Sequence, residues 1–398
     1  MRIAFLIDVF PSISETFILN QITGLIKQGH EITIFSAAHS NDIIVHPDVR
    51  TYNLLNKTYY HNDRPHFFIL KIILGIFIFI KNIFISPKII LNSLNFLKYG
   101  KEALSLNLLI KSSYFIKTPV DIFFCHFGHN GNLAVTLNEL GIKGKIVTMF
   151  HGYDIRQAIA NHTDYSKLFE HGSLFLSIAF SNTDALIKLG CPIEKIIHHP
   201  VGIDQKNIIQ SYGHEKKIII ITVARLVKEK NIIFALDVIK KITEMPEHFD
   251  IEYRLIGEGP MRPDIDLKIT RLQLSNIVKC LGALPQDDVY TQLAEADIFI
   301  STSEAEVLPV ALMEAQAAGL PVIAPEIGSI SDIVINENSG FLIKSNNPSV
   351  YAEKIKMLIL NPKLRADMKK NALKNIKKFD IDELNFRLNK LFLKLLNN

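Results

Sequence analysis

Two glutamates, Glu306 and Glu314, stand eight positions apart with Pro309 between them. Proline suits the first position of a helix, so we expect a helix to start at Pro309 and to carry Glu314 about a turn and a half later. The free amides of a helix start can hold phosphate oxygens, and a carboxylate can accept hydrogen bonds from sugar hydroxyls. The pattern suits a nucleotide sugar, with ribose at one glutamate, the diphosphate at the helix start and a hexose at the other glutamate. The alternative is that both side chains are ordinary solvated charges.

Arg225 and Lys230 form a second group that could do chemistry. Arg225 directly follows the apolar run Ile218–Val223, which predicts a buried strand. A guanidinium at the end of such a strand can form two parallel hydrogen bonds with a diphosphate, and Lys230 can add a second cation. The alternative is a pair of surface charges, which is the interpretation that we adopt for the neighbouring Lys228.

His151 directly follows another predicted strand, residues 145–150, and Asp154 stands three positions later. Ligands of parallel α/β sheets bind outside the carboxyl ends of the strands, so His151 is a site candidate and Asp154 a candidate partner of its ring or of an acceptor. His126 and His129 stand at the end of the preceding strand and are either structural or line an acceptor site. The alternative for His151 is a core or loop histidine. No carboxylate or cysteine stands at ligand spacing with these histidines, so we expect no metal site.

The elements that position these residues alternate between strand and helix patterns, which predicts an α/β fold with parallel sheets. In the first half of the chain, strands are expected at residues 2–7, 31–36, 121–125 and 145–150. Ser12 and Glu15 have the spacing of a capping box, so a helix is expected to start near Ser14. Residues 52–117 lack alternating strand patterns and are expected to be helical.

A second series of strands begins near Lys216 and indicates a second α/β domain. Its strands are expected at residues 218–223, 252–256, 277–281, 297–301 and 322–324. We place the N-terminal domain at residues 1–205 and the C-terminal domain at residues 206–378. Residues 379–398 are expected to form a helix that packs back on the N-terminal domain.

The composition excludes several classes of protein. The 398 residues are 48% hydrophobic and 21% charged, a globular balance that excludes a disordered chain and a disulfide-stapled miniprotein. A formal net charge of +4 gives no argument for a nucleic-acid partner. The three cysteines, Cys125, Cys191 and Cys280, are far apart, which favours a reducing cytoplasm over a disulfide framework. The apolar runs are shorter than the roughly 20 residues that a membrane-spanning helix needs.

Several motifs, in consistent order along the chain, resemble those of the retaining glycosyltransferases of family 4. They are residues 199–204 (HPVGID), 222–230 (TVARLVKEK), 255–260 (LIGEGP), 281–285 (LGALP) and 306–314 (EVLPVALME). Residues 10–18 (FPSISETFI) and 151–154 (HGYD) resemble family members that build bacterial surface polysaccharides, of the colanic-acid and exopolysaccharide type. The sequence departs from the family at Val307 and Leu308, which stand where a glycine and an aromatic residue are frequent.

The resemblance implies an α/β fold of two facing Rossmann-like domains, the GT-B type, with an interdomain cleft. It places a cleft histidine that contacts the donor sugar at His151, and it implies His151 and Glu306 as the catalytic residues. The implied donor-binding residues are Arg225, Lys230, Val307, Leu308, Pro309 and Glu314. The candidate acceptor-binding residues are Ser14, Glu15, Thr16, His126 and Asp154.

The implied activity is retaining transfer of a hexose from a nucleoside-diphosphate sugar to a lipid-linked saccharide acceptor, in bacterial surface polysaccharide biosynthesis. The C-terminal domain would bind the donor and the N-terminal domain the acceptor. No cofactor or metal is expected beside the nucleotide sugar. Two alternatives stay open. One is a sugar-nucleotide epimerase of the same architecture, and the other is a non-catalytic sugar-binding or scaffold protein, which would tolerate loss of Arg225 or Glu314.

Residues 66–120 contain seven lysines and a single acid, Glu102. Lys71, Lys81, Lys88 and Lys98 interrupt apolar runs in this segment. Segments rich in lysine and apolar residues bind anionic membrane surfaces. The alternative is a pair of helices that pack on the N-terminal domain and turn their lysines to solvent. We expect a cytoplasmic protein. The membrane interpretation of this segment would make it peripheral at the inner face of the plasma membrane, and both interpretations stay open here.

Overall fold

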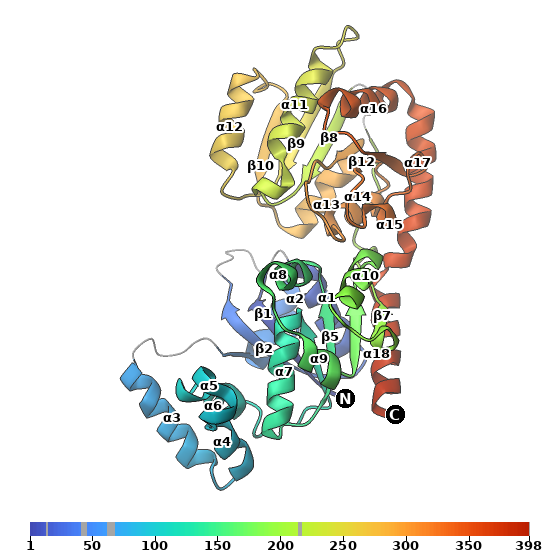
Figure 1. Cartoon of the computed structure of the whole chain (residues 1–398). Coiled ribbons are helices and arrows are strands. Elements are labelled where there is room, and N and C mark those ends of the chain that lie inside the picture. Colours follow the sequence, from blue (N-terminus) through green and yellow to red (C-terminus); the bar gives the residue numbers. More distant parts are fainter. Residues whose placement is uncertain (13–14, 41–45, 62–67, 214–216, 398) are drawn as a thin grey trace. The chain divides into compact units, whose positions relative to one another are not determined.

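The computed structural model describes residues 1–398 except 13–14, 41–45, 62–67, 214–216 and 398. It divides the chain into two compact units. Unit 1 contains residues 1–199 and 385–398, and unit 2 contains residues 200–384. Each unit is a parallel β-sheet with helices packed on it (Figure 1). The two α/β domains expected from the sequence are therefore present. The compact units divide after residues 199 and 384, whereas the sequence analysis places the boundaries after residues 205 and 378.

The sheet of unit 1 has the strand order β3-β2-β1-β4-β5-β6-β7, and all of its neighbouring strands pair in parallel. Its strands are β1 (Arg2–Phe10), β2 (Glu31–His39), β3 (Thr58–Tyr60), β4 (Ile122–His126), β5 (Lys145–Phe150), β6 (Leu174–Ser177) and β7 (Ile196–His198). The central strands β4 and β5 are buried almost throughout, which is why they read as continuous apolar runs. Their carboxyl ends carry His126 and His151.

The helices of unit 1 fall into two groups. Those that connect the strands are α1 (Thr16–Lys27), α2 (Pro47–Thr51), α7 (Gly128–Leu140), α8 (Tyr153–Asn161), α9 (Ser166–His171) and α10 (Phe180–Lys188). A separate group lies beside the sheet (Figure 1) and consists of α3 (Phe68–Asn82), α4 (Pro87–Ser93), α5 (Phe96–Leu104) and α6 (Asn107–Ser113). This group has a small core of its own, built around Ile78, Ile90, Leu109 and Ile110.

Unit 2 has a sheet of order β10-β9-β8-β11-β12-β13, again parallel throughout. Its strands are β8 (Ile218–Val223), β9 (Ile251–Ile256), β10 (Val278–Gly282), β11 (Ile298–Ile300), β12 (Val322–Pro325) and β13 (Gly340–Ile343). Its helices are α11 (Ile232–Thr243), α12 (Arg262–Arg271), α13 (Gln286–Glu295), α14 (Val310–Ala317), α15 (Ile330–Ile333), α16 (Pro348–Leu360) and α17 (Pro362–Asn375). The run of isoleucines in β8 favours a strand because β-branched side chains pack well on a pleated surface.

The last helix, α18 (Ile381–Asn397), begins in unit 2, and its residues from Asn385 onward belong to unit 1. Phe392 is fully buried, and its ring lies edge-on against Phe124 of β4, with 5.3 Å between the centroids. His30 Nε2 lies 2.9 Å from Asn389 Oδ1, and the Asn385 amide donates to the Asn20 carbonyl at 3.1 Å. This part of α18 is therefore integral to the core of unit 1.

Two local expectations differ from the structure. Residues 58–60 form the short strand β3 inside the segment expected to be helical, because three residues are too few to show an alternating pattern. Helix α1 starts at Thr16 with Glu15 as its N-cap, rather than near Ser14. The Glu15 amide donates to the Ser12 carbonyl at 3.4 Å, so Ser12 lies in a turn before the helix.

Within the described part of the chain, no helix combines the length and the apolar character needed to cross a bilayer.

Three buried histidines make the stability of unit 1 depend on pH. Burial lowers the pKa of His151 and His199 to about 3 and that of His126 well below 6.5. Such a group contributes stability above pH 6.5 that is lost on acidification, by up to about 1.4 kcal/mol per histidine and pH unit. Two shifts oppose part of this loss: burial raises the pKa of Asp154 to about 6, and Asp8 raises the pKa of His129 above 6.5 although burial lowers it. In unit 2, burial raises the pKa of Glu314 to about 7, so its contribution is present below pH 4.5 and is lost as the pH rises through 7.

We therefore expect the two units to respond oppositely between pH 7 and pH 5: unit 1 loses stability and unit 2 gains it. Hydrogen exchange of core amides, corrected for the intrinsic pH effect, measures each unit separately through β4 and β5 or β8 and β9. The variant His199→Phe should flatten the response of unit 1, whereas His248→Gln, which changes an exposed histidine of unit 2, should leave both responses unchanged. A parallel response of the two units would contradict the prediction.

Candidate functional site

The loop after β8 carries Arg225 and is shaped by a close backbone contact. The Ala224 amide donates to the Ile256 carbonyl at 3.0 Å, and the Leu226 amide donates to the Glu258 carbonyl at 2.9 Å. A Cβ atom at Gly257, whose φ is +133°, would lie 1.9 Å from the Ala224 carbonyl oxygen. Only glycine fits there, so the GEGP motif serves to press the loop after β9 against the loop of Arg225.

Arg225 itself is exposed, and the described residues offer its guanidinium no hydrogen bond or ion pair. Its backbone, by contrast, is fixed on both sides by the contacts just described. A free guanidinium on a fixed loop at the end of a strand is available to an anionic ligand.

Lys230 and Glu306 form an ion pair between two strand-end loops. Lys230 ends the single turn η4 (Lys228–Lys230) after β8, and Glu306 lies in the loop between β11 and α14. The two loops are also joined by their backbones, because the Glu304 amide donates to the Glu229 carbonyl at 2.8 Å. The hydroxyl of Thr302 lies 3.2 Å from the Lys230 carbonyl. The two residues that the sequence assigns to phosphate and hexose are therefore brought together.

The helix that follows, α14, starts at Val310 with Pro309 as its N-cap, one position later than expected. Leu308 and Pro309 are buried and Val307 is half-buried, so this segment presents its backbone rather than large side chains. Gly328, with a φ of +54°, sets its shape, because a Cβ atom there would lie 1.9 Å from the Glu306 carbonyl oxygen. The Ser329 amide also donates to the Val307 carbonyl at 3.1 Å.

Glu314 is a buried carboxylate with two polar neighbours from α13. The Gln286 amide donates to Glu314 Oε1 at 3.2 Å, and the Tyr290 hydroxyl lies 3.5 Å from the same oxygen. Burial raises the pKa of Glu314 to about 7, although both neighbours favour the ionised form. Both contacts use Oε1, so Oε2 has no hydrogen bond among the described residues. A carboxyl group with a pKa near 7 and an available oxygen suits recognition of hydroxyl groups. The sequence reasoning missed Gln286 and Tyr290; the position of Gln286 directly after the LGALP motif is the signal that could have found them.

In unit 1 the candidate residues surround a pair of buried histidines. His126 Nδ1 lies 3.0 Å from His151 Nε2, and the two rings are stacked with centroids 5.1 Å apart. Phe17 of α1 covers His151, with ring centroids 4.9 Å apart. Burial holds the pKa of both histidines far below neutrality, so the pair is neutral at physiological pH. One ring donates to the other, and His151 acts as a polar group without charge.

Asp154 is a buried carboxylate that orders the loop after β5. It accepts hydrogen bonds from the amides of Gly128 at 3.0 Å, His151 at 3.0 Å and Ile155 at 3.1 Å. It therefore ties the start of α8 to the start of α7 and fixes the backbone of His151. His126 and Asp154 stay predictions as acceptor-binding residues, and the structure gives each of them partners inside the protein.

His129, which the sequence places near His126, instead pairs with Asp8 of β1. His129 Nε2 lies 2.6 Å from Asp8 Oδ1, and the Asn130 amide donates to the same oxygen at 2.8 Å. The sequence reasoning missed Asp8, and its position as the first acid at the end of an apolar strand is the available signal. Glu15 and Thr16 lie at the start of α1, whereas Ser14 lies outside the described residues.

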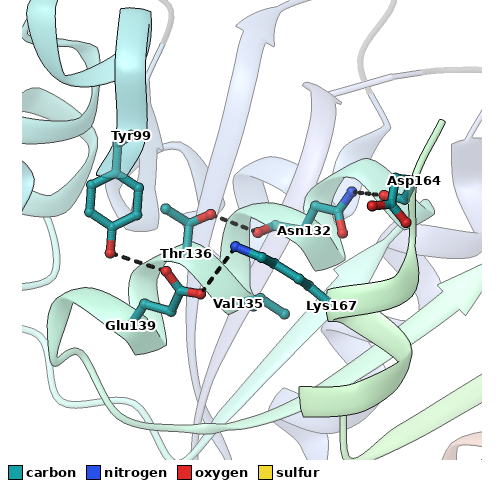
Figure 2. Close-up of a pocket in the computed structure, with 7 residues that line it drawn as sticks. All are labelled: Tyr99, Asn132, Val135, Thr136, Glu139, Asp164 and Lys167. Atoms are coloured by element: carbon teal, nitrogen blue, oxygen red, sulfur yellow. Dashed lines mark hydrogen bonds and ion pairs between the residues drawn. The ribbon is translucent and has the colours of Figure 1, made fainter. Parts of the chain in front are cut away.

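A cavity of about 160 Å³ lies elsewhere in unit 1 and contains none of the predicted site residues. Figure 2 shows Glu139 among the residues that line it, where it accepts a hydrogen bond from the Tyr99 hydroxyl at 3.1 Å and pairs with Lys167 at 3.8 Å. Lys98 adds a third contact to Glu139 at 2.8 Å. These contacts satisfy the carboxylate and fasten α5 to α7, so we assign the cavity a structural role.

Comparison with known proteins identifies the family. Residues 204–375 match the model of the glycosyl transferases group 1. The chain is 33% identical to the colanic acid biosynthesis glycosyltransferase WcaL of Escherichia coli over 89% of this chain and 90% of that protein. It is also 33% identical to the amylovoran biosynthesis glycosyltransferase AmsK of Erwinia amylovora, over 88% of this chain and 89% of that protein.

Solved structures share the fold at low sequence identity. Anabaena HepE in complex with UDP and glucose has a TM-score of 0.70 and 16% identity, and the match covers 99% of this chain and all of that one. The lipopolysaccharide outer core galactosyltransferase WaaB in its apo form has a TM-score of 0.66 and 15% identity, with the same coverage. With its two parallel-sheet α/β domains of the GT-B type, the chain belongs to the group 1 glycosyltransferases, among the relatives of the colanic acid and amylovoran biosynthesis enzymes.

Proposed function

We propose that this glycosyltransferase transfers a hexose, with retention of anomeric configuration, from a nucleoside-diphosphate sugar to a lipid-linked saccharide in surface polysaccharide biosynthesis. The observation that carries the proposal is the joining of the loops after β8 and β11, which pairs Lys230 with Glu306 beside the start of α14. Two cations and a helix start match a diphosphate, and two carboxylates match sugar hydroxyls. The names of the relatives, which refer to colanic acid and amylovoran biosynthesis, support the polysaccharide.

In this proposal Arg225, Lys230 and the backbone N–H groups of Val307 and Leu308 bind the diphosphate, while Pro309, which has no N–H, begins the helix beside them. Glu314 accepts hydrogen bonds from the ribose, and Glu306 from the transferred hexose. Lys230 and Glu306 form an ion pair with each other, so a nucleotide sugar that binds between them must supply a partner for both. UDP and glucose, which are bound to HepE, have this combination of diphosphate and hydroxyl groups.

The reaction requires charge stabilisation more than a nucleophile. As the bond from the anomeric carbon to the diphosphate oxygen breaks, negative charge builds on the diphosphate and the sugar becomes oxocarbenium-like. Cations aimed at the leaving oxygens favour this state more than the bound donor. The acceptor hydroxyl attacks from the face that the diphosphate leaves, and its proton passes to the leaving phosphate, so no carboxylate nucleophile is needed. His151, which is neutral, would bind a hydroxyl of the sugar without adding charge.

The test is incubation of the purified protein with a panel of UDP- and GDP-hexoses, with and without a lipid extract. Transfer of label to lipid, with the anomeric configuration of the donor kept in the NMR spectrum of the product, is the expected result. Isomerisation of the nucleotide sugar without acceptor would indicate the epimerase alternative. Neither reaction, in protein that still binds the nucleotide, would indicate a non-catalytic protein.

We also propose that no divalent metal is needed, because Arg225, Lys230 and the start of α14 supply the positive charge that a metal would supply. Transfer should therefore persist at full rate after treatment with EDTA. Loss of activity with EDTA that manganese restores would overturn the metal-free proposal while leaving the assignment of glycosyl transfer intact.

Arg225→Ala should raise the KM for the donor and lower kcat, with a loss of about 100-fold or more in kcat/KM, because the charge-assisted contact strengthens as the diphosphate leaves. Arg225→Lys should recover only part of the loss, since an ammonium lacks the planar fork. Lys228→Ala is the matched control, because it removes an exposed cation of the same loop and should change little. Steady-state kinetics on folded protein decides, and normal kinetics in Arg225→Ala would remove this residue from the site.

Substitutions of Glu314 and Glu306 should affect different quantities, namely nucleotide affinity and turnover. Glu314→Gln should weaken calorimetric binding of the nucleoside diphosphate by about tenfold or more, because a charged hydrogen-bond acceptor is lost. Glu306→Gln should leave this binding nearly intact and lower turnover, because its assigned partner is the hexose. An equal loss of nucleotide affinity in both variants would contradict this division.

The same assignment predicts a pH dependence. Because the pKa of Glu314 is about 7, affinity for the intact nucleotide sugar should rise between pH 6 and pH 8 as the carboxylate ionises, and Glu314→Gln should remove this rise.

A further inference from the structure

The outer face of α3 is apolar along its whole length. The exposed fractions of its outward side chains run from 49% to 71%, and these side chains are Ile69, Leu70, Ile73, Ile76, Phe77 and Ile80. Their spacing follows the helical repeat, so they form one stripe. The opposite face is also apolar and packs inward, with Ile78 buried in the small core of the group and Gly75 close to Leu106. The helix is thus hydrophobic all round but covered on one side only.

The exposed apolar surface continues beyond α3. Phe84 stands four residues after Ile80 and is 92% exposed, and Leu97 of α5 is 87% exposed. The same group exposes four further large apolar side chains, namely Ile85, Leu91, Phe96 and Leu104. Large apolar side chains that gather on one part of a surface mark an interaction site.

The lysines of this group divide into those with a polar partner inside the protein and those without an ion pair. Lys71 donates to Asn107, Lys98 pairs with Glu139, and Lys111 pairs with Glu102. Lys81, Lys88 and Lys101, in contrast, are exposed and have no ion pair in the part of the chain that the structure describes. Lys81 lies next to the stripe, with its Nζ 5.6 Å from the centre of the Phe77 ring.

We propose that the α3 stripe, with Phe84 and with Lys81, Lys88 and Lys101 beside it, is a binding surface for an anionic lipid bilayer. The 15 residues of α3 rise only about 22 Å, which is shorter than the roughly 30 Å of hydrocarbon, so the helix lies in the membrane interface. The apolar stripe enters the interface and the lysines meet lipid phosphates. This proposal concerns attachment and stands independently of the proposed glycosyl transfer.

Charge and composition favour a bilayer over a protein partner. A second copy of the chain seated on this surface would bring its unpaired lysines against the same lysines, with only Glu102 as an acid between residues 66 and 120. Protein interfaces are depleted in lysine at their cores, whereas an anionic membrane attracts lysine at the edge of an inserted apolar face. Among the described residues of α3–α6 the single acid is Glu102, which pairs with Lys111, so no unpaired acid of this group would direct a basic partner.

The chain contains no tryptophan, so the fluorescence of a single introduced tryptophan reports only on the surroundings of that residue. Phe84→Trp should show a blue-shifted emission with vesicles of phosphatidylcholine and phosphatidylglycerol, and shallowly brominated lipids should quench it more than deeply brominated ones. Leu267→Trp, at an apolar residue of unit 2 that is 70% exposed, is the matched control and should show no shift. Deep quenching of Phe84→Trp, or no shift, would overturn the interfacial placement.

Sedimentation with the same vesicles tests the contributions of the apolar side chains and of the lysines separately. The triple variant Ile73→Ser/Phe77→Ser/Phe84→Ser should bind at least tenfold more weakly than the wild type. Lys81→Gln/Lys88→Gln/Lys101→Gln should also bind at least tenfold more weakly, because each lysine near the surface contributes up to about fivefold. Its control is Lys363→Gln/Lys370→Gln/Lys374→Gln, which removes the same charge from exposed positions of unit 2 and should bind normally.

Binding of the wild type should require phosphatidylglycerol and weaken at high salt, because salt screens the lysines. Failure of the wild type to bind anionic vesicles at low salt would overturn the proposal. Sedimentation velocity would then identify a second copy as the occupant if the wild type is a dimer that the serine variant dissociates. Circular dichroism verifies that each variant is folded, and all changed side chains are exposed, so unfolding is not expected.

Discussion

The backbone contact between the loops after β8 and β9 is the constraint on which the candidate site of unit 2 depends. Gly257 approaches the Ala224 carbonyl so closely that no side chain can stand between them, and two further hydrogen bonds lock the same loops. Arg225 directly follows Ala224, so the same contacts fix its backbone. The loop then reaches β11 through the Glu229–Glu304 contact, which sets Lys230 against Glu306. This series of backbone contacts fixes the main chain at Arg225, Lys230 and Glu306. Restricting long side chains costs conformational entropy, and a fixed main chain leaves less of that freedom to be lost.

The two units differ in the partners that their buried polar side chains have. In unit 2, Glu314 is a buried acid with amide and hydroxyl neighbours, and its ionisation is left close to neutral pH. In unit 1, the Asp154 carboxylate accepts hydrogen bonds from three backbone amides. The His126–His151 pair is neutral, and the aromatic ring of Phe17 packs against it. Unit 2 therefore offers charge to a ligand, whereas unit 1 offers a rigid and uncharged polar group.

The parts of the molecule that were predictable from the sequence are those governed by local pattern. The bounds of β5 and β8 agree with the expected runs, because continuous apolar runs mark fully buried parallel strands. The strand β3 was missed because it is defined by pairing with β2 and not by its own three residues. Asp8, Gln286 and Tyr290 were missed for a related reason. The positions of Asp8 and Gln286 next to a strand and a motif could mark them as candidates, but their partners are far away in the sequence and no local spacing identifies those partners. The lysines of the α3–α6 group were visible in the sequence, but only the fold separates the paired ones from the available ones.

Helix α18 has a consequence for how the protein is made. Unit 1 is discontinuous, because its sheet and most of its helices precede unit 2 along the chain while the segment from Asn385 follows it. Without that segment, Phe124, Asn20 and His30 lose the contacts that Phe392, Asn385 and Asn389 supply. During synthesis, unit 1 is therefore first to emerge from the ribosome but cannot complete its core until unit 2 has been made. A fragment that stops before α18 would leave an apolar face uncovered on unit 1, so the two units cannot be separated by a single cut.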